Sequence, residues 1–327
     1  MNSRIPDDIL ANLSQFVEDR FGLYFPENKW HDLERSFMNV ANRLGFDDPI
    51  PCIQCLLSNY LTKQQEDTIA RSLTIGETYF FREKKSFDAL ERHILPQIIS
   101  KATTGNKRLK LWSAGCATGE EAYTLAMVVS RVIPNTDDWN ITILATDINT
   151  EFLTKASKGI YNEWSFRETP KWVKEEYFKK TVDNSYQLDK KIMKMVTFIP
   201  LNLMEYMSAF AIEHASEMDV VLCRNVFIYF STDNIKKIIG NIASSLKEGG
   251  WLIVSQTELS NIYQPEFVSR EVAGAIVYQK AGQHEIERIK NKKSFPRLIQ
   301  RNVNLKKSAG MSVPLPKAPK RFAEKPA

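Results

Sequence analysis

The strongest constraint on the fold is the alternation of short apolar runs with helical stretches after residue 85. Four runs have the length and composition of buried strands: 109–115, 141–147, 218–223 and 251–255. Helices are predicted between them over 120–133, after Thr150 and over 232–246. Strands that alternate with helices favour a parallel sheet with helices on both faces. We therefore predict an α/β fold for residues 85–282.

The segment before this domain carries only helical signals. Apolar positions recur at helical spacing from Asp7 and again from about Asn28 to Leu44, where Gly45 follows as a stop. We predict a separate all-α domain over 1–73 and a linker over 74–84.

A stretch in the middle of the α/β domain breaks the alternation. The sequence YQLDKKIMKMVTFIP (186–200) alternates apolar and polar residues as antiparallel strands do. We expect a small antiparallel β insertion at about 160–200.

The last 45 residues differ from the rest of the chain in charge. They hold 12 Lys or Arg against 3 Asp or Glu, a net charge of +9, whereas the whole chain carries +5. The remaining 282 residues therefore carry −4, so the pI of about 8.8 is no argument for a nucleic-acid-binding domain. Five of the 14 prolines also fall here, and we predict a flexible basic tail over 283–327.

Composition and cysteine count exclude several classes of protein. Hydrophobic residues make up 43% of the 327 residues, enough for a sizeable core without disulfides or metals. No apolar run reaches the roughly 18 residues of a membrane span, and the N-terminal sequence lacks a secretory signal. The four cysteines are too scattered for a disulfide framework. We predict a cytoplasmic protein without membrane insertion.

A glycine loop is predicted between the first strand and the helix that follows it. In LKLWSAGCATGEE, Gly115 and Gly119 allow the backbone to approach a ligand and leave amide groups free at the helix start. Glu120 and Glu121 follow where a phosphate-binding loop would have Lys and Ser or Thr, so a ligand with positive charge or free hydroxyls is favoured. A tight strand-to-helix turn would require the same glycines.

An acidic residue ends the second predicted strand. Asp147 stands where doubly wound folds hold a ribose diol, although it could also cap the following helix. Loop and carboxylate together favour an adenosine-type ligand, either a dinucleotide or S-adenosylmethionine. SLKEGGWLIV (245–254) favours the second, because a strand introduced in this way resembles those of Rossmann-like methyltransferases.

Further motifs make the resemblance specific. TIGETYFFRE (74–83), CRNVFIYF (223–230) and SQTELSN (255–261) accompany WSAGCATGEEAYTLA and ATDINTEFLTKASKGIY. Together they resemble the CheR-type chemoreceptor glutamate methyltransferases, from the helical start to about residue 280. The resemblance implies a Rossmann-like class I methyltransferase domain with a small antiparallel β insertion, preceded by an all-α domain and a linker that closes over the cofactor.

The same resemblance implies a site for S-adenosylmethionine. Thr78 and Arg82 of the linker should touch the cofactor, and Gly76 occupies a position where many members have Asn. Glu121 and Asp147 should hold the amino-acid and ribose parts. The other implied cofactor-binding residues are Asn202 and Leu203 against the adenine, and Arg224 and Asn225 at the mouth of the active site.

Arg82 and Tyr229 are the implied catalytic residues. Tyr229 matches a tyrosine near the transferred methyl, and Arg82 could orient the carboxylate of the substrate or of the cofactor. A glutamate with a pKa near 4.3 is ionised at neutral pH, so its methylation needs no general base. The chain shows no Ser-His-Asp or Cys-His arrangement. The alternatives are an Arg82 paired with Glu83 or Glu121 and a Tyr229 in the sheet core.

The second predicted helix carries a basic face. Arg35 and Arg43 match the basic helix with which the family meets its acidic, helical substrate, although a solvated face would look the same. Cys52 and Cys55 lie among apolar helical neighbours, which indicates packing, and the four histidines are dispersed. No metal site is predicted.

The sequence therefore predicts S-adenosylmethionine-dependent formation of glutamate methyl esters on bacterial chemoreceptors. The expected partner is the cytoplasmic helical domain of methyl-accepting chemoreceptors, with the enzyme a monomer that binds no nucleic acid. Three alternatives are a class I methyltransferase for another protein of a chemosensory-like pathway, a cofactor-sensing binding module, and a nucleic-acid methyltransferase suggested only by the basic tail.

Overall fold

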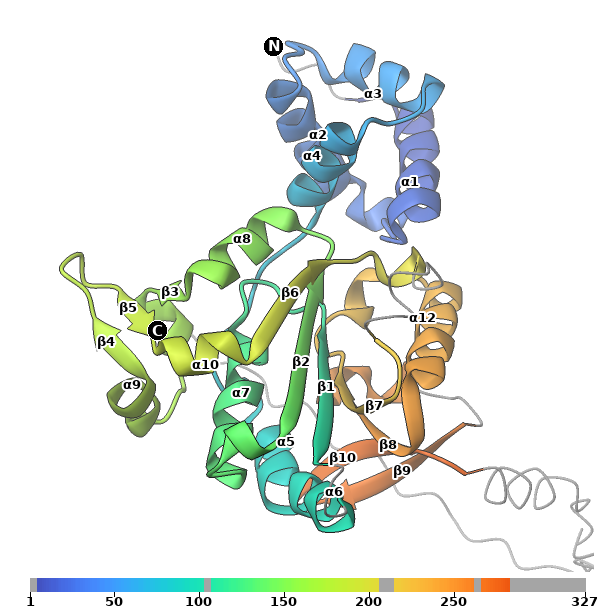
Figure 1. The fold of residues 1–327 in the computed structure, drawn as a ribbon. Coiled ribbons are helices and arrows are strands. Elements are labelled where there is room, and N and C mark those ends of the chain that lie inside the picture. The colour runs from blue at the N-terminus through green and yellow to red at the C-terminus, as the bar shows by residue number, and fades with distance from the viewer. Residues whose placement is uncertain (1–4, 103–106, 206–214, 262–265, 283–327) are drawn as a thin grey trace, which may run out of the picture.

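The computed structural model describes residues 5–102, 107–205, 215–261 and 266–282. A helical domain stands at one end of a larger domain built on a seven-stranded sheet (Figure 1). Among the described residues, no helix is long and apolar enough to cross a membrane.

The helical domain holds four α-helices around its own apolar core. They are α1 (Asp7–Phe21), α2 (Trp30–Arg43), α3 (Pro49–Ser58) and α4 (Lys63–Leu73), with the 3-10 turn η1 (Glu27–Lys29). The helix ends follow local chemistry: Gly22 ends α1 in the left-handed conformation, and Thr62 and Gln65 form a capping box at the start of α4. Buried Leu13 and Phe37 belong to this core, which is separate from those of the sheet domain.

The larger domain contains the predicted parallel sheet. Its strand order is β6-β2-β1-β7-β8-β10-β9. The first five of these strands run parallel, and β10 pairs antiparallel with both β8 and β9. The strands are β1 (Arg108–Ala114), β2 (Asn140–Asp147), β6 (Val196–Pro200), β7 (Met218–Leu222), β8 (Leu246–Ile253), β9 (Phe267–Val272) and β10 (Ala275–Lys280).

Helices cover both faces of this sheet, as its buried strands require. On β7, Val220 and Leu222 face one apolar core and Val221 faces the other. The first core takes α5 (Lys84–Ala89), the π-helical turn η2 (Leu90–Ile94), α6 (Leu95–Lys101), α7 (Glu120–Val132) and α8 (Thr150–Lys158). The second takes α12 (Thr232–Ser245), on the opposite side of the sheet in Figure 1. The α/β fold predicted from the sequence is confirmed.

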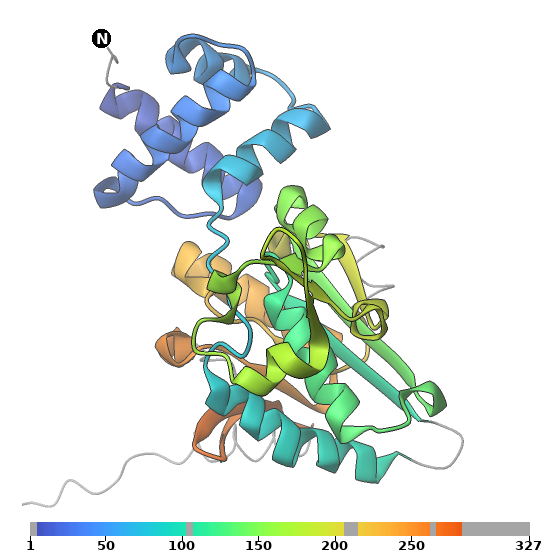
Figure 2. The same ribbon diagram turned by 90° about the vertical axis from the view of Figure 1, so that its left-hand side faces the viewer.

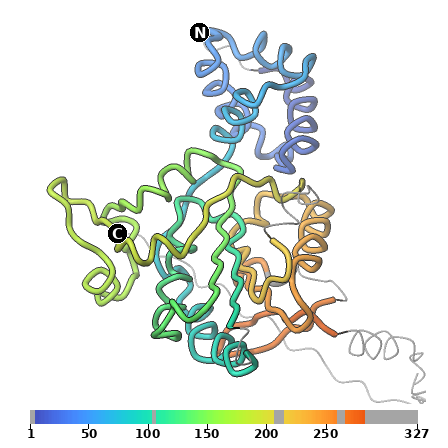
Figure 3. Tube along the Cα trace, viewed as in Figure 1, coloured from blue at the N-terminus to red at the C-terminus, as the bar shows by residue number. Residues whose placement is uncertain are grey.

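A small second sheet projects from the first. Its order is β3 (Ile160–Tyr161), β5 (Tyr186–Leu188), β4 (Phe178–Lys180), all antiparallel, and it carries η4 (Glu163–Phe166) and α9 (Lys171–Tyr177). The Cα trace in Figure 3 shows this insertion on the side away from α12. The strand prediction over 186–200 is wrong beyond Leu188, because 190–194 form helix α10 and β6 joins the main sheet parallel to β2.

Short 3-10 segments complete the described fold. They are η3 (Thr136–Asp138), η5 (Leu203–Glu205), η6 (Phe227–Tyr229) and η7 (Gln256–Asn261). The predicted basic tail, 283–327, lies outside the described residues.

The linker, polar contacts and the apolar side chains of Ile148, Tyr229 and Phe230 hold the helical domain against the sheet domain. Figure 2 shows the linker running from α4 down to α5. Backbone pairing joins the two domains at Leu23 and Phe230, where the Tyr24 N–H donates to the Tyr229 carbonyl at 2.8 Å. The Asn234 amide also donates to the Gly22 carbonyl at 3.1 Å.

Candidate active site

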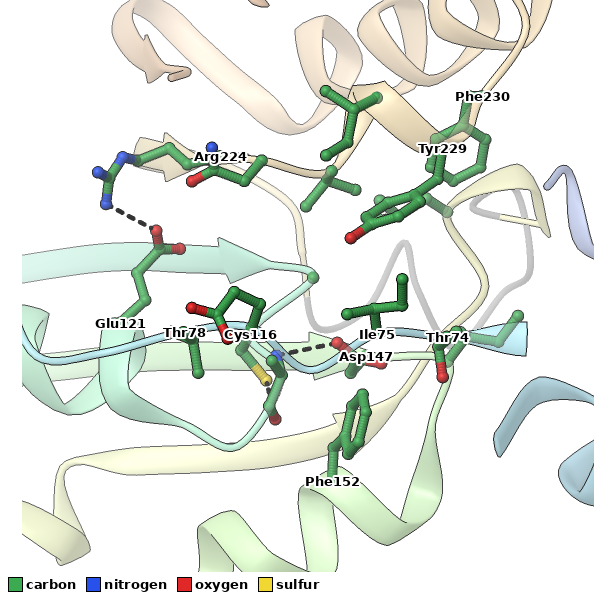
Figure 4. A pocket seen from close by; sticks show the side chains of 18 of the residues that line it. Thr74, Ile75, Thr78, Cys116, Glu121, Asp147, Phe152, Arg224, Tyr229 and Phe230 are labelled. Atoms are coloured by element: carbon green, nitrogen blue, oxygen red, sulfur yellow. Dashed lines mark hydrogen bonds and ion pairs between the residues drawn. The ribbon is translucent and has the colours of Figure 1, made fainter. Parts of the chain in front are cut away.

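A cavity of about 360 Å³ opens between the linker and the carboxyl ends of β1, β2 and β7. The strand order reverses between β1 and β7, and open α/β sheets bind ligands where it does so. The cavity is lined by the linker, the glycine loop, the end of β2, residues 201–203 and residues 224–230. Figure 4 shows side chains from these segments pointing into one space.

The glycine loop brings backbone into the cavity wall. Gly115 has φ +79°, and a Cβ there would lie 2.5 Å from a methyl of Val226. Its N–H and that of Cys116 both donate to the Thr146 carbonyl, at 2.8 and 2.9 Å, which fixes the loop to the end of β2. Glycine is therefore required at position 115 both by backbone conformation and by the close approach of the 224–230 segment.

Asp147 ties the loop to β2 and faces the cavity. One carboxylate oxygen accepts the Ala117 N–H at 2.9 Å and the other accepts the Asn149 N–H at 2.9 Å. Figure 4 shows the first of these bonds. Burial raises the pKa of Asp147, and the backbone N–H groups oppose that shift. Each oxygen keeps a lone pair with which a ligand hydroxyl could bond.

Glu121 belongs to a buried charge cluster. Its carboxylate accepts from the Ser113 hydroxyl at 2.7 Å and pairs with the Arg224 guanidinium at 3.1 Å. Arg224 also lies 3.5 Å from Glu83, and its side chain is only 1% exposed. Burial raises the pKa of Glu121, and the charge of Arg224 opposes the shift. Arg224 thus forms part of the inner wall, whereas the sequence placed it at the mouth.

The linker forms the opposite wall. Thr78 and Arg82 line the cavity, and the Arg82 guanidinium donates to the Glu77 carbonyl at 2.6 Å. Gly76 lies outside the lining residues, because it packs against the Phe152 ring, which a Cβ would approach to 2.7 Å. A side chain at position 76 would therefore have to displace that ring.

The segment after β7 carries Asn225 and Tyr229, both of which line the cavity. Tyr229 lies in η6 and outside the sheet core, with its hydroxyl pointing into the space in Figure 4. Asn225 adopts a left-handed conformation with φ +58°. The carboxylate of Glu258 accepts the Asn225 and Phe227 N–H groups, both at 2.8 Å, and so holds this segment in place. Glu258 belongs to the SQTELSN motif (255–261), but the sequence did not predict this role for it.

Asn202 and Leu203 close the cavity toward the helical domain. The Asn202 side chain accepts the Met204 N–H at 3.0 Å and donates to the Arg20 carbonyl at 3.2 Å. Leu203 and Ile148 supply apolar surface here. A flat apolar ring system suits this wall, which contacts both domains.

Several lining residues were missed by sequence reasoning. Thr74 accepts from the Asn149 amide at 2.8 Å, and Ile75 and Phe152 are apolar residues of quoted motifs to which the sequence assigned no role. Cys116 also lines the cavity, and burial raises the pKa of its thiol. A protonated thiol is a weak nucleophile, so it would not compete for an electrophilic ligand.

Arg35 and Arg43 lie on α2, outside the cavity. Arg35 pairs with Asp32 at 2.7 Å on the exposed side of the helix. Cys52 is buried and Cys55 exposed, and both are free thiols. In the described part of the chain, no group of His, Cys, Asp and Glu has the geometry of a metal site.

The side chains that line the cavity fit an adenosyl ligand with a cationic amino-acid group. Asp147 offers acceptors for hydroxyls, Glu121 contributes negative charge, and Phe152, Ile148 and Leu203 offer apolar contact for a purine. These features, at the switch point of this sheet, define a class I S-adenosylmethionine-dependent methyltransferase.

Comparison with known proteins gives the family. Residues 76–272 match the family model described as CheR methyltransferase, SAM binding domain, and the chain belongs to this family. The chemotaxis protein methyltransferase of Borreliella burgdorferi is 33% identical over 260 residues, 79% of this chain and 90% of that protein. Chemotaxis protein methyltransferase 2 of Vibrio cholerae is 30% identical and covers 78% of this chain and 86% of its own length.

Proposed function

We propose that this methyltransferase forms γ-methyl esters on glutamate side chains of bacterial chemoreceptors, as the names of its relatives and the resemblance of its motifs suggest. One structural observation carries the choice of acceptor. The two inner carboxylates of the cavity already have partners: Glu121 is paired with Arg224, and Asp147 holds two backbone N–H groups. Neither is placed as a free base. An acceptor that is already anionic, such as a glutamate carboxylate, needs none.

The reaction is a displacement in line. When bound, S-adenosylmethionine would supply a methyl group on a sulfonium sulfur for transfer to a glutamate oxygen, with a neutral thioether as the leaving group and a methyl ester as the product. The protein contributes by holding the two reactants in line, an effect worth up to about 7–11 kcal/mol. We assign Tyr229 and Arg82, both in the cavity wall, to orientation of the reacting groups.

We propose that Thr78, Glu121, Asp147 and the 202–203 pair, which line the cavity, contact the cofactor. Arg224 and Asn225 also line the cavity, and Arg224 acts in addition through its ion pair with Glu121. Gly76 acts by leaving room for Phe152.

The substrate would be an acidic helical bundle. We propose that Arg35, which pairs with Asp32 at 2.7 Å, and Arg43 provide the cations on the exposed face of α2 with which such a bundle could pair. Methylation removes a negative charge from the bundle and so reduces the repulsion between its helices. Reduced repulsion can change the signalling state of the receptor. We propose that the enzyme acts as a monomer in the cytoplasm on the cytoplasmic domain of these receptors.

Transfer of labelled methyl to chemoreceptor-containing membranes tests this proposal. Label released as methanol by mild alkali would identify a carboxyl ester. A receptor whose candidate glutamates are replaced by alanine serves as the control and should take up no label. Label that resists alkali, or an absence of transfer while the cofactor still binds, would contradict the proposed substrate.

A further inference from the structure

Arg167, just after η4 in the β insertion, makes an unusual set of contacts with the linker. Its guanidinium lies between two aromatic rings, 4.3 Å from the centre of Tyr79 and 4.4 Å from that of Trp164. Such stacking of a planar cation stabilises both rings in place. Tyr79 belongs to the linker and Trp164 to the insertion, so this one side chain joins the two segments.

Polar contacts of Arg167 reach two more linker residues. It forms an ion pair with Glu77 and donates to the Thr78 carbonyl at 3.3 Å and to the Trp164 carbonyl at 2.8 Å. The Arg167 side chain is 19% exposed and that of Glu77 is 54% exposed, so only the Arg167 end of the ion pair is shielded from water. Arg167 therefore contacts three consecutive residues of the linker.

Those three residues form part of the cofactor cavity. Glu77, Thr78 and Tyr79 all line it, and the Glu77 carbonyl accepts from Arg82 at 2.6 Å. Two neighbouring hydrogen bonds also join the linker to the insertion. The Phe80 N–H donates to the Ser165 carbonyl at 2.9 Å, and the Tyr79 hydroxyl donates to Glu168 at 2.9 Å. The position of this wall thus depends on the insertion.

The linker backbone needs such support. Phe81 and Glu83 have φ of +58° and +55°, a left-handed conformation that costs free energy for residues other than glycine. A backbone in this conformation persists only where the surrounding contacts hold it.

We propose that Arg167 is a positioning residue for S-adenosylmethionine: it holds the linker wall of the cavity closed against the β insertion. It does so without lining the cavity itself. The inference concerns the cofactor, so it stands independently of the proposed glutamate substrate.

Two variants and a matched control test this role. Arg167→Ala removes both stacking and charge, and Arg167→Lys keeps the charge next to Glu77 but loses the planar stack between the rings. The control is Lys174→Ala. Lys174 also lies over two rings, those of Phe166 at 5.1 Å and Tyr186 at 4.7 Å, and pairs with Glu163 at 2.5 Å. It belongs to the same insertion but is not a lining residue of the cavity.

Calorimetry with S-adenosylhomocysteine, thermal unfolding and hydrogen exchange of peptides spanning 74–83 are the readouts, all on the full chain. We expect Arg167→Ala to raise Kd about ten-fold, Arg167→Lys to raise it less, and Lys174→Ala to leave it within about two-fold. Exchange of the 74–83 amides should accelerate in Arg167→Ala alone. In steady-state assays KM for S-adenosylmethionine should rise more than kcat falls.

Two results would overturn the proposal. One is an Arg167→Ala protein with the wild-type Kd and exchange rates. The other is an equal loss of affinity in Arg167→Ala and Lys174→Ala at equal loss of Tm, which would mean that the insertion merely stabilises the fold.

Discussion

Replacement of Asp147 by alanine is the most informative single change in the cavity. The carboxylate holds the Ala117 and Asn149 N–H groups, each at 2.9 Å, and keeps lone pairs that we assign to the ribose hydroxyls of the cofactor. The change therefore removes the proposed ligand contact and one of the bonds that fix the glycine loop to the end of β2, where the Thr146 carbonyl still accepts the Gly115 and Cys116 N–H groups.

The magnitude follows from these contacts. A hydrogen bond from a hydroxyl to a charged acceptor contributes about 1.5–3 kcal/mol, equivalent to about 10- to 150-fold in Kd. The two released N–H groups lose their acceptor, but water can enter the vacated space. We expect the free energy of unfolding to fall by only about 1–2 kcal/mol.

Asp147→Asn separates the two effects. The amide keeps the shape of the side chain but has one acceptor oxygen, so it can hold one of the two backbone N–H groups. We expect a loss of affinity close to that of alanine with a smaller loss of stability.

Titration calorimetry with S-adenosylhomocysteine and thermal unfolding measure both quantities on the same samples. A Kd for Asp147→Ala within two-fold of wild type, in a protein that unfolds cooperatively, would refute the assignment of Asp147 to the cofactor.

Three further sets of substitutions and the pH dependence of ligand binding test other residues of the protein. Tyr229→Phe removes the hydroxyl that points into the cavity and should lower kcat about ten-fold or more while the Kd for S-adenosylhomocysteine stays unchanged; a changed Kd with normal kcat would contradict its assignment to the reacting groups. Arg35→Ala combined with Arg43→Ala should raise KM for the receptor several-fold, an effect that salt should reduce, and leave cofactor affinity unchanged; an unaffected KM would mean that the α2 face is only solvated. Glu258→Gln leaves one acceptor oxygen for the Asn225 and Phe227 N–H groups and the Ser255 hydroxyl, so Tm should fall by the equivalent of about 2–3 kcal/mol, and an unchanged Tm would show that this carboxylate does not hold the segment. Burial raises the pKa of both Asp147 and Glu121, so they gain protons at a higher pH than exposed carboxyls; affinity for S-adenosylhomocysteine should fall as pH drops from about 7 to 5, while the contribution of these two groups to stability rises, and a flat affinity profile would contradict the model of two ionised acceptors.

Local sequence signals were sufficient to predict the parallel sheet and the edge of it that carries the cavity. The buried strands have apolar runs on both faces, Gly115 marks the turn, and Asp147 ends the second strand. Each of these signals depends on residues only a few positions apart, so it can be recognised without knowledge of the tertiary structure.

Features that depend on distant contacts were predicted poorly or missed. Residues 190–200 alternate like strands, yet they form α10 and then a strand of the main sheet, because pairing with β2 and packing against α7 outweigh local pattern. Arg224 is a buried partner of Glu121, which lies 103 residues away in the sequence. Glu258 bonds to Phe227, 31 residues away, and Arg167 bonds to Thr78, 89 residues away. The sequence carries no local mark of these pairings.

Mass spectrometry of a receptor cytoplasmic domain, incubated with the protein and trideuteromethyl S-adenosylmethionine, tests the central claim most directly. We expect labelled methyl groups on glutamate side chains, lost after mild alkali and absent with Asp147→Ala at low cofactor concentration. Label confined to lysine, arginine or another side chain would contradict it.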